Sequence, residues 1–198
     1  MSSSYARYKT NLKFWMGVNP DVDGMLQGYG HLSSSDAEFS TKFLKSLMEG
    51  DKAVTKSGKA LDCGAGIGRV SKLVLLPLFN QVDLIDQTKH FIDNAPNFIG
   101  PELVKKVGKF HCCGLQDFQP SAHGPYDVVW IQWVIGYLTD SDLVAFFDRC
   151  KKALTNEGML VIKDNMKKSG ESDADDEDGS VCRYVFMAIY LFVVTCVV

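Results

Sequence analysis

Five apolar segments of strand length alternate with segments of helix length through most of the chain. The first kind covers residues 59–63, 81–86, 109–113, 126–134 and 158–163, and the second covers residues 5–16, 70–79, 88–98 and 140–154. Most of the apolar segments lack the polar alternation of a strand with one solvated face, so we expect strands that are buried on both faces. This order predicts an α/β fold with a doubly wound, mostly parallel sheet.

The nine residues LDCGAGIGR, at 61–69, join the first predicted strand to the helix that follows it. Ligands of doubly wound sheets bind at such turns. Gly64, Gly66 and Gly68 carry no Cβ, so the backbone can approach a ligand closely. The third glycine comes four positions after the first instead of five, which disfavours the dinucleotide motif GxGxxG. The alternative is that these glycines only let a helix pack closely on the sheet.

Two charged residues near this turn indicate the kind of ligand. Asp86 ends the second predicted strand, where a carboxylate can accept hydrogen bonds from two ribose hydroxyls. Arg69 can pair with a ligand carboxylate in a two-pronged geometry, although an arginine at the start of a helix is often only a solvated charge. S-adenosylmethionine carries a ribose, a carboxylate and a sulfonium but no pyrophosphate. The turn therefore predicts a class I methyltransferase.

Composition limits the partners and the compartment. The 198 residues suffice for one domain with its own core, and a formal charge of −3 disfavours a nucleic-acid partner held by its phosphates. The six cysteines show no metal-ligand spacing, so we expect no metal site, and the N-terminus lacks the apolar core of a secretory signal. We expect reduced thiols and a location in the cytoplasm and nucleus.

Longer strings resemble one family, the alpha-N-terminal protein methyltransferases, which methylate the α-amine of proteins that begin Xaa-Pro-Lys or Xaa-Pro-Arg. The strings are VDGMLQGYGHLSS (22–34), ALDCGAGIGR (60–69), VLLPLF (74–79), FHCCGLQDF (110–118), YDVVWIQWVIGYLTD (126–140) and VIKDNM (161–166). The resemblance implies a class I, Rossmann-like domain at residues 1–183. Its helical extension at 1–50 would bind the peptide, and a divergent apolar tail at 184–198 would leave the closing strands of the sheet incomplete.

The resemblance also implies a set of residues that bind S-adenosylmethionine: Gly64, Arg69, Asp86, Gln87, Thr88, Leu115, Gln116 and Gln132. The first two would hold its methionine part, the next three its ribose, Leu115 and Gln116 its adenine, and Gln132 its amino-acid end. The alternative for Leu115 is an ordinary core position. The two later glutamines would then be polar groups that are satisfied locally.

For the substrate, the resemblance implies Trp15, Leu26, Leu32 and Trp133 around the N-terminal dipeptide, and Asp175, Asp178 and Ser180 near its amine and basic third residue. An α-amine with a pKa of about 7.7–8.0 must lose a proton before it attacks a methyl group. The family assigns that work to residues that match Asn165 and Asp178. Two alternatives stay open: Trp130 or Trp133 belongs to the core, and the acidic run at 171–178 is merely solvated.

Three departures from the family stand out. Tyr137 replaces a histidine, which removes a group that titrates near neutral pH. Gln27 replaces a glycine beside the expected peptide channel. The tail YVFMAIYLFVVTCVV is shorter than the roughly 20 residues of a membrane helix, so a membrane partner is not expected. Its β-branched residues predict one added strand.

The sequence thus predicts S-adenosylmethionine-dependent methylation of protein N-termini that begin Xaa-Pro-Lys or Xaa-Pro-Arg. The alternative, suggested by the divergent tail, is a weakly active or inactive relative that binds the cofactor or an intact partner and regulates that partner. Such a chain would associate with itself or with a full-length relative. A small-molecule methyltransferase is a third possibility.

Overall fold

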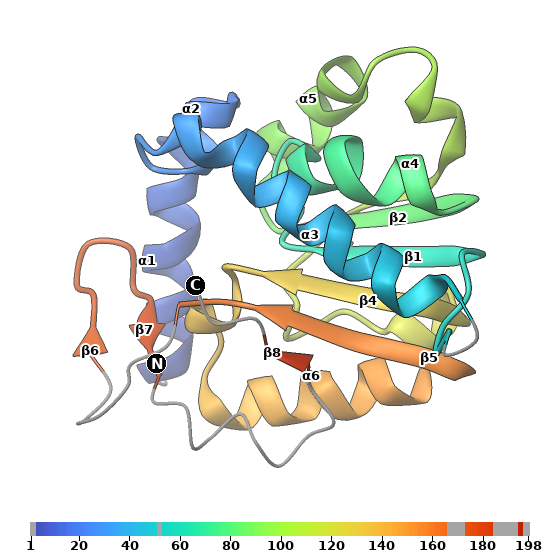
Figure 1. Ribbon diagram of the computed structural model, residues 1–198. Coiled ribbons are helices and arrows are strands. Elements are labelled where there is room, and N and C mark those ends of the chain that lie inside the picture. Colours follow the sequence, from blue (N-terminus) through green and yellow to red (C-terminus); the bar gives the residue numbers. More distant parts are fainter. Residues whose placement is uncertain (1–2, 51–52, 166–172, 184–193, 196–198) are drawn as a thin grey trace.

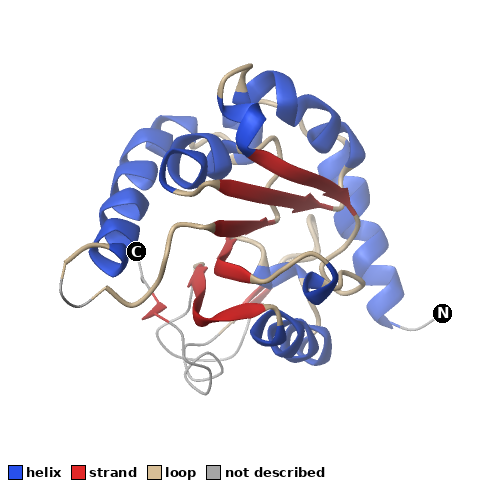
Figure 2. Ribbon diagram, turned by 90° about the vertical axis from the view of Figure 1, so that its right-hand side faces the viewer, coloured by secondary structure: helices blue, strands red, loops and turns tan. Residues whose placement is uncertain are grey.

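The computed structural model describes residues 3–50, 53–165, 173–183 and 194–195. A sheet with the strand order β3-β2-β1-β4-β5-β8 lies between two layers of helices (Figures 1 and 2). The strands are β1 (Lys59–Cys63), β2 (Gln81–Asp86), β3 (Val107–Cys112), β4 (Tyr126–Gln132), β5 (Leu154–Lys163) and β8 (Val194–Thr195). Every pair of neighbours in this sheet is parallel, which confirms the predicted α/β fold.

Successive residues of the central strands point to opposite faces of the sheet. Ala60, Val128 and Trp130 join one apolar cluster together with residues of α3 (Ser33–Met48) and α5 (Lys89–Ile99). The residues next to them along the strands join a second cluster with α6 (Asp140–Lys152). Figure 1 shows α3, α4 (Leu76–Leu78) and α5 above the sheet and α6 below it. Both faces are therefore covered, as the apolar strands predict.

Two elements differ from their predicted form. The segment 70–79 is a π-helical turn, Ser71–Leu75, followed by the single turn of α4. Pro77 lies in that turn and has no backbone N–H to continue a longer helix. Strand β5 begins at Leu154 rather than at 158, because Gly158 lies where the pairing with β4 shifts its register instead of at the strand start.

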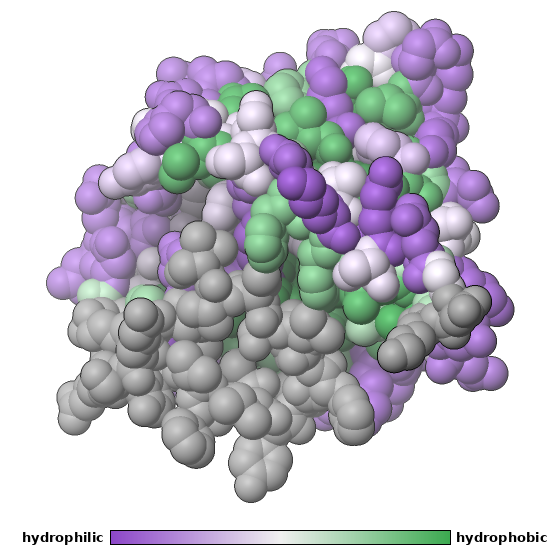
Figure 3. Space-filling view, in the orientation of Figure 1, coloured by the Kyte–Doolittle hydropathy of each residue, from purple (hydrophilic) through white to green (hydrophobic). Residues whose placement is uncertain are grey.

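The N-terminal extension is helical and comprises α1 (Ser3–Met16), α2 (Val22–Met25), a short 3-10 turn (Gly30–Leu32) and α3. Beside α1 lies an antiparallel hairpin of β6 (Asp173–Ala174) and β7 (Val181–Cys182) (Figure 1). Figure 3 shows hydrophilic residues with scattered apolar groups over the face that carries α3. Helix α1 and the hairpin therefore lie next to each other although they are far apart in the sequence.

Strand β8 adds an edge to the sheet beside β5, where Val161 pairs with Val194. This agrees with the strand that the β-branched tail predicts. Residues 184–193 and 196–198 of that tail lie outside the described residues. Within the described part, no helix combines the length and apolar character needed to cross a bilayer.

Candidate active site

A pocket opens at the carboxyl ends of β1, β2 and β4, where the strand order reverses on either side of β1. Parallel sheets bind their ligands at this switch point. The empty space, part of it open to solvent, is about 940 Å³, which suits a ligand the size of a nucleoside cofactor. Its lining includes all the residues predicted to bind the cofactor: Gly64, Arg69, Asp86, Gln87, Thr88, Leu115, Gln116 and Gln132.

The glycine turn has the backbone geometry that its sequence requires. Gly64 has a φ of 69° and Gly66 a φ of 56°, a region that favours glycine. A Cβ on Gly64 would lie 2.7 Å from Cγ2 of Val134, and one on Gly66 would lie 2.4 Å from Sδ of Met25. The helix-packing alternative applies at Gly68, where a Cβ would lie 2.9 Å from Ile99 of α5 and 3.1 Å from Leu84 of β2.

Asp86 is fixed at the end of β2 by two backbone donors. Its Oδ2 accepts a hydrogen bond from the N–H of Gly66 at 2.9 Å, and its Oδ1 accepts one from the N–H of Thr88 at 2.8 Å. Burial raises the pKa of this carboxyl, and the two N–H groups oppose that shift. Each oxygen keeps a lone pair for a further donor. This arrangement suits two ribose hydroxyls.

Arg69 and Gln132 meet at a carboxylate that the sequence analysis did not single out. Asp36, on α3, accepts from Nη1 of Arg69 at 2.8 Å and from Nε2 of Gln132 at 3.0 Å, and it also pairs with Lys163. Burial raises the pKa of Asp36, but the donors from Lys163, Arg69 and Gln132 outweigh it and hold the pKa below its usual value. Asp36 lies two residues beyond the family string at 22–34, so no motif marked it.

The expected adenine side is partly core. Leu115 follows β3, is buried, and belongs to the apolar cluster under α6 while it also lines the pocket. The side chain of Gln116 lines the pocket and donates from Nε2 to Asp117 at 3.1 Å. Both alternatives for these residues therefore apply together: Leu115 is a core residue that forms a pocket wall, and Gln116 has a local partner.

The apolar part of the pocket is formed by Trp15, Leu26 and Trp133. Trp15 packs edge-on against the rings of Phe91 and Tyr137, with centroids 6.1 and 6.0 Å apart. The open question of the two indoles is settled, because Trp130 is 1% exposed in the core and Trp133 lines the pocket.

Leu32 differs from Trp15, Leu26 and Trp133, the other apolar residues of the predicted peptide site. It lies on the 3-10 turn Gly30–Leu32, its side chain is 46% exposed, and it does not line this pocket.

Asp178 lies in the loop of the hairpin and contacts the pocket through Tyr137. Its Oδ2 accepts from the hydroxyl of Tyr137 at 2.8 Å, and its Oδ1 accepts from the N–H of Ser180 at 2.8 Å. Asn11 of α1 donates to the backbone carbonyl of Asp178 at 3.1 Å. Burial, followed by the charge of Asp178, raises the pKa of Tyr137 well above its ordinary value. Tyr137 therefore stays protonated and donates to the carboxylate.

A second, acidic groove borders the hairpin. Its lining includes Asp21, Asp23, Gln27, Asp175, Glu177 and Asp178. Asp178 lines this groove while its partner Tyr137 lines the first pocket, so the two residues form the wall between them. Gln27 has a φ of 47°, a left-handed conformation that explains why a glycine suits this position in the family.

Asn165, the second predicted catalytic residue, lies at the end of β5 beside β7. It is exposed, its N–H donates to Oδ1 of Asp164 at 2.8 Å, and its carbonyl accepts from the thiol of Cys182. Asn165 lines neither the pocket nor the acidic groove. The structure therefore does not bring it together with the residues described above.

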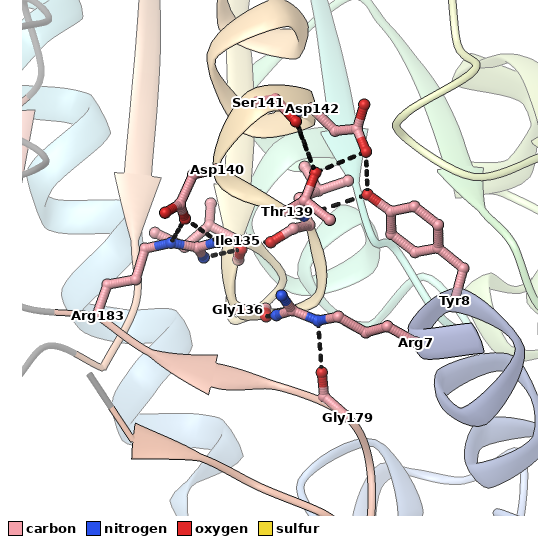
Figure 4. A network of polar contacts seen from close by, with 11 residues as sticks. Arg7, Tyr8, Ile135, Gly136, Thr139, Asp140, Ser141, Asp142, Gly179 and Arg183 are labelled. Atoms are coloured by element: carbon pink, nitrogen blue, oxygen red, sulfur yellow. Dashed lines mark hydrogen bonds and ion pairs between the residues drawn. The ribbon is translucent and has the colours of Figure 1, made fainter. Parts of the chain in front are cut away.

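Two arginines hold α1 and the hairpin against the pocket (Figure 4). Arg7 donates to the carbonyls of Gly179 at 2.8 Å and Gly136 at 2.5 Å. Arg183 donates to the carbonyls of Ile135 and Leu138 and forms an ion pair with Asp140. These bonds connect the backbones on both sides of the Tyr137–Asp178 contact, and so they fix its geometry.

Comparison with known proteins gives this site its context. Residues 3–193 match the family described as "AdoMet dependent proline di-methyltransferase". The chain belongs to this family. It is 53% identical over 170 residues to the N-terminal Xaa-Pro-Lys N-methyltransferase 1 of Danio rerio, covering 86% of this chain and 75% of that protein. The human protein of the same name is 50% identical over 179 residues, covering 90% and 78%.

A solved structure agrees with these relatives. The S-adenosylmethionine-dependent methyltransferase of Leishmania major superimposes with a TM-score of 0.82 at 35% identity, covering 94% of this chain and 71% of that one. A phosphoethanolamine N-methyltransferase of Haemonchus contortus, at 19% identity and a TM-score of 0.72, shares the fold and covers 96% and 40%. The family predicted from the sequence is therefore confirmed, and the chain is an S-adenosylmethionine-dependent methyltransferase.

The residues of this family member fit the cofactor. The glycine turn excludes side chains, the lone pairs of Asp86 suit ribose hydroxyls, and Asp36 occupies only one of the five N–H donors of Arg69. Arg69 and Gln132 would hold the amino-acid end, and Asp86 the ribose. When bound, the cofactor supplies an electrophilic methyl group on its sulfonium.

Proposed function

We propose that this methyltransferase modifies the free α-amine of proteins that begin Xaa-Pro-Lys or Xaa-Pro-Arg. The observation that carries this proposal is the Tyr137–Asp178 pair, which lies between the cofactor pocket and a groove lined with carboxylates. The names of the relatives, N-terminal Xaa-Pro-Lys N-methyltransferases, support the same substrate class. A basic third residue would lie in the acidic groove near Asp175, while the terminal amine reaches toward the pocket. Ser180 lines neither cavity and would act on the substrate through its N–H bond to Asp178.

Asp178 is the group that would accept the proton of the amine. At neutral pH much of an α-amine is protonated, because its pKa is about 7.7–8.0, and only the neutral form attacks the methyl group. A carboxylate held by two donors keeps a fixed orientation toward the amine, with the proton passing directly or through one water. Tyr137 orients this carboxylate and does not act as a base itself, because its pKa is raised.

The apolar walls would position the second residue of the peptide. Trp15, Leu26 and Trp133 form a surface on which a proline ring packs and from which water is excluded. Alignment of nitrogen, methyl carbon and sulfur in such a site accounts for much of the rate. Leu32 and Asn165 line neither the pocket nor the acidic groove, so no contact with the peptide is proposed for them.

We also propose that the chain acts in the cytoplasm and nucleus. This is supported by the free thiols of its described cysteines: Cys63, Cys112, Cys113, Cys150 and Cys182. Self-association, or association with a full-length relative, is proposed only for the case of an inactive chain.

The function is tested with labelled S-adenosylmethionine and two peptides, one beginning Ser-Pro-Lys and one Ser-Gln-Lys, each with and without an acetylated N-terminus. We expect label only in the free Ser-Pro-Lys peptide. Equal labelling of both free peptides, or labelling of an acetylated one, would contradict the substrate class. Cofactor binding by calorimetry without any turnover would favour the inactive relative.

A further inference from the structure

Below the expected methionine end of the pocket lies a buried cluster with more positive than negative charge. Arg69 and Lys163 both pair with Asp36, and among the described residues neither cation has another carboxylate within ion-pair distance. The three side chains are only 5%, 4% and 8% exposed. Buried charges are costly unless they are paired. The three charges therefore sum to one net positive charge, which Asp62, a buried carboxyl of the pocket that lies beyond ion-pair distance of Arg69, offsets only in part.

The donors of Arg69 are divided between the cluster and the pocket. Its Nη1 donates to Asp36 at 2.8 Å, and among the described residues no acceptor is recorded for Nε or Nη2. The guanidinium lies over the ring of Trp133, with Cζ 5.3 Å from the centroid, and Arg69 lines the pocket. The remaining N–H groups can therefore take a carboxylate in the two-pronged geometry of arginine.

Gln132 is held in one amide orientation by partners on both sides. Its Oε1 accepts from the indole N–H of Trp130 at 3.0 Å, so its Nε2 must face Asp36, and Nε2 lies 3.0 Å from both oxygens of that carboxylate. One N–H can serve both oxygens, which leaves the second N–H for a ligand. Asp36 thus contacts both residues that are expected at the amino-acid end of the cofactor.

Lys163 completes the cluster from the next strand. Gln132 and Lys163 are paired neighbours at the ends of β4 and β5, and Nζ of Lys163 also donates to the hydroxyl of Ser40 at 3.0 Å. The ammonium group is buried behind Asp36 and does not line the pocket. It can therefore influence a ligand through its charge and through its contacts with Asp36 and with Trp133, whose ring centroid lies 6.0 Å from Nζ.

We infer that Asp36 and Lys163 are positioning residues for the amino-acid end of S-adenosylmethionine. Asp36 orients Arg69 and Gln132. Lys163 offsets the charge of Asp36, so that the positive charge of Arg69 stays available to the cofactor carboxylate. This inference rests on the part of the proposed function that places that carboxylate at Arg69.

The test compares two ligands that differ in the amino-acid end. S-adenosylhomocysteine carries it, whereas 5′-methylthioadenosine has the same nucleoside and sulfur without it. Calorimetry on the full chain gives the ratio of the two Kd values. Replacement of Lys163 by Met (K163M) removes one buried charge near the ligand and should raise the Kd of S-adenosylhomocysteine about tenfold or more. The Kd of 5′-methylthioadenosine should change less than about twofold. The matched control, K59M, removes a lysine paired with buried Asp83 at 2.8 Å at the opposite end of β1 and should leave the ratio unchanged.

A double variant separates charge from structure. D36N combined with K163M restores the single positive charge of Arg69, and the new amide keeps one oxygen that can accept from Arg69. The double variant should therefore bind S-adenosylhomocysteine better than K163M alone. Equal weakening of the binding of both ligands in K163M, or an unchanged ratio, would overturn the inference. If the unmodified chain itself binds both ligands equally well, the placement of the carboxylate at Arg69 fails instead. Methylthioadenosine binding and the thermal midpoint verify that each variant is folded.

Discussion

Replacing Gly64 by alanine tests the glycine turn most directly. The change places a Cβ where φ is 69°, and a left-handed backbone costs a residue with a side chain about 1–2 kcal/mol. The new atom would also lie 2.7 Å from Cγ2 and 2.9 Å from Cβ of Val134, so that the pocket wall must move. Overpacking of this kind costs about 1–3 kcal/mol. Together we expect a loss of about 2–5 kcal/mol in the free energy of unfolding.

Gly50→Ala is the matched control. Gly50 also has a positive φ, 83°, but a Cβ there meets no atom within 4 Å. Only the backbone part of the cost should appear, so urea unfolding should show G64A to be less stable than G50A by about 1–3 kcal/mol. Calorimetry should show that G64A also loses affinity for S-adenosylhomocysteine while G50A keeps it. Equal stability of the two variants would refute the packing explanation of the turn.

Three further predictions concern the polar groups of the site. Asp62 lines the pocket, and burial raises its pKa to about 6, against a hydrogen bond from Ser71. The fold therefore favours the protonated carboxyl, and this stabilisation, present below about pH 4, is lost as the pH rises through about 6. Asp62→Asn should have a free energy of unfolding about 2–3 kcal/mol higher than that of the unmodified chain at pH 7, and this difference should shrink toward pH 4. Urea unfolding that gives the same difference at both pH values would contradict this. Asp86→Asn presents an amide N–H₂ to a backbone donor, so calorimetry should show the Kd values of S-adenosylhomocysteine and 5′-methylthioadenosine both raised about tenfold or more. A raised Kd for the first ligand alone would exclude a ribose contact. Tyr137→Phe removes a donor to Asp178 and should lower kcat about tenfold, whereas Tyr137→His should add a limb near pH 6–7 to the profile of kcat/KM; a kcat of Y137F equal to that of the unmodified chain would show that Tyr137 does not orient the carboxylate.

The strand ends that form the pocket could be predicted from the sequence because they depend on short local patterns of apolar residues and glycines. β1 and β2 have the expected bounds, Asp86 closes the second of them, and the glycine turn follows the first. Apolar runs without polar alternation identify buried parallel strands, and a glycine-rich turn after such a strand identifies the ligand site. The residues that the family resemblance assigns to the cofactor all line the pocket, whereas Leu32 and Asn165 of the expected peptide site do not.

The charge cluster could not be predicted in this way. Asp36 follows three serines and lies in the first turn of an ordinary amphipathic helix, so nothing local separates it from a solvated aspartate. Only the packing of α3 across the ends of β4 and β5 brings it to Arg69, Gln132 and Lys163. Such contacts between distant segments leave no spacing in the chain.

The two indoles show how a single backbone angle changes a residue's role. Trp130 follows the strand alternation into the core, where its N–H bonds to Gln132. Trp133 has a φ of 54°, which breaks that alternation at the end of β4 and directs its ring to the pocket. Periodicity alone could say that one indole is core, but it could not say which.

The bonds from Arg7 to Gly136 and Gly179 also bear on how the enzyme matures on the ribosome. Synthesis runs from the N-terminus, so α1 emerges first and waits for a hairpin that is made some 170 residues later. A nascent chain can build its nucleoside pocket while the wall formed by Tyr137 and Asp178 is still incomplete. The wall formed by Tyr137 and Asp178 can therefore close only after the hairpin has left the exit tunnel.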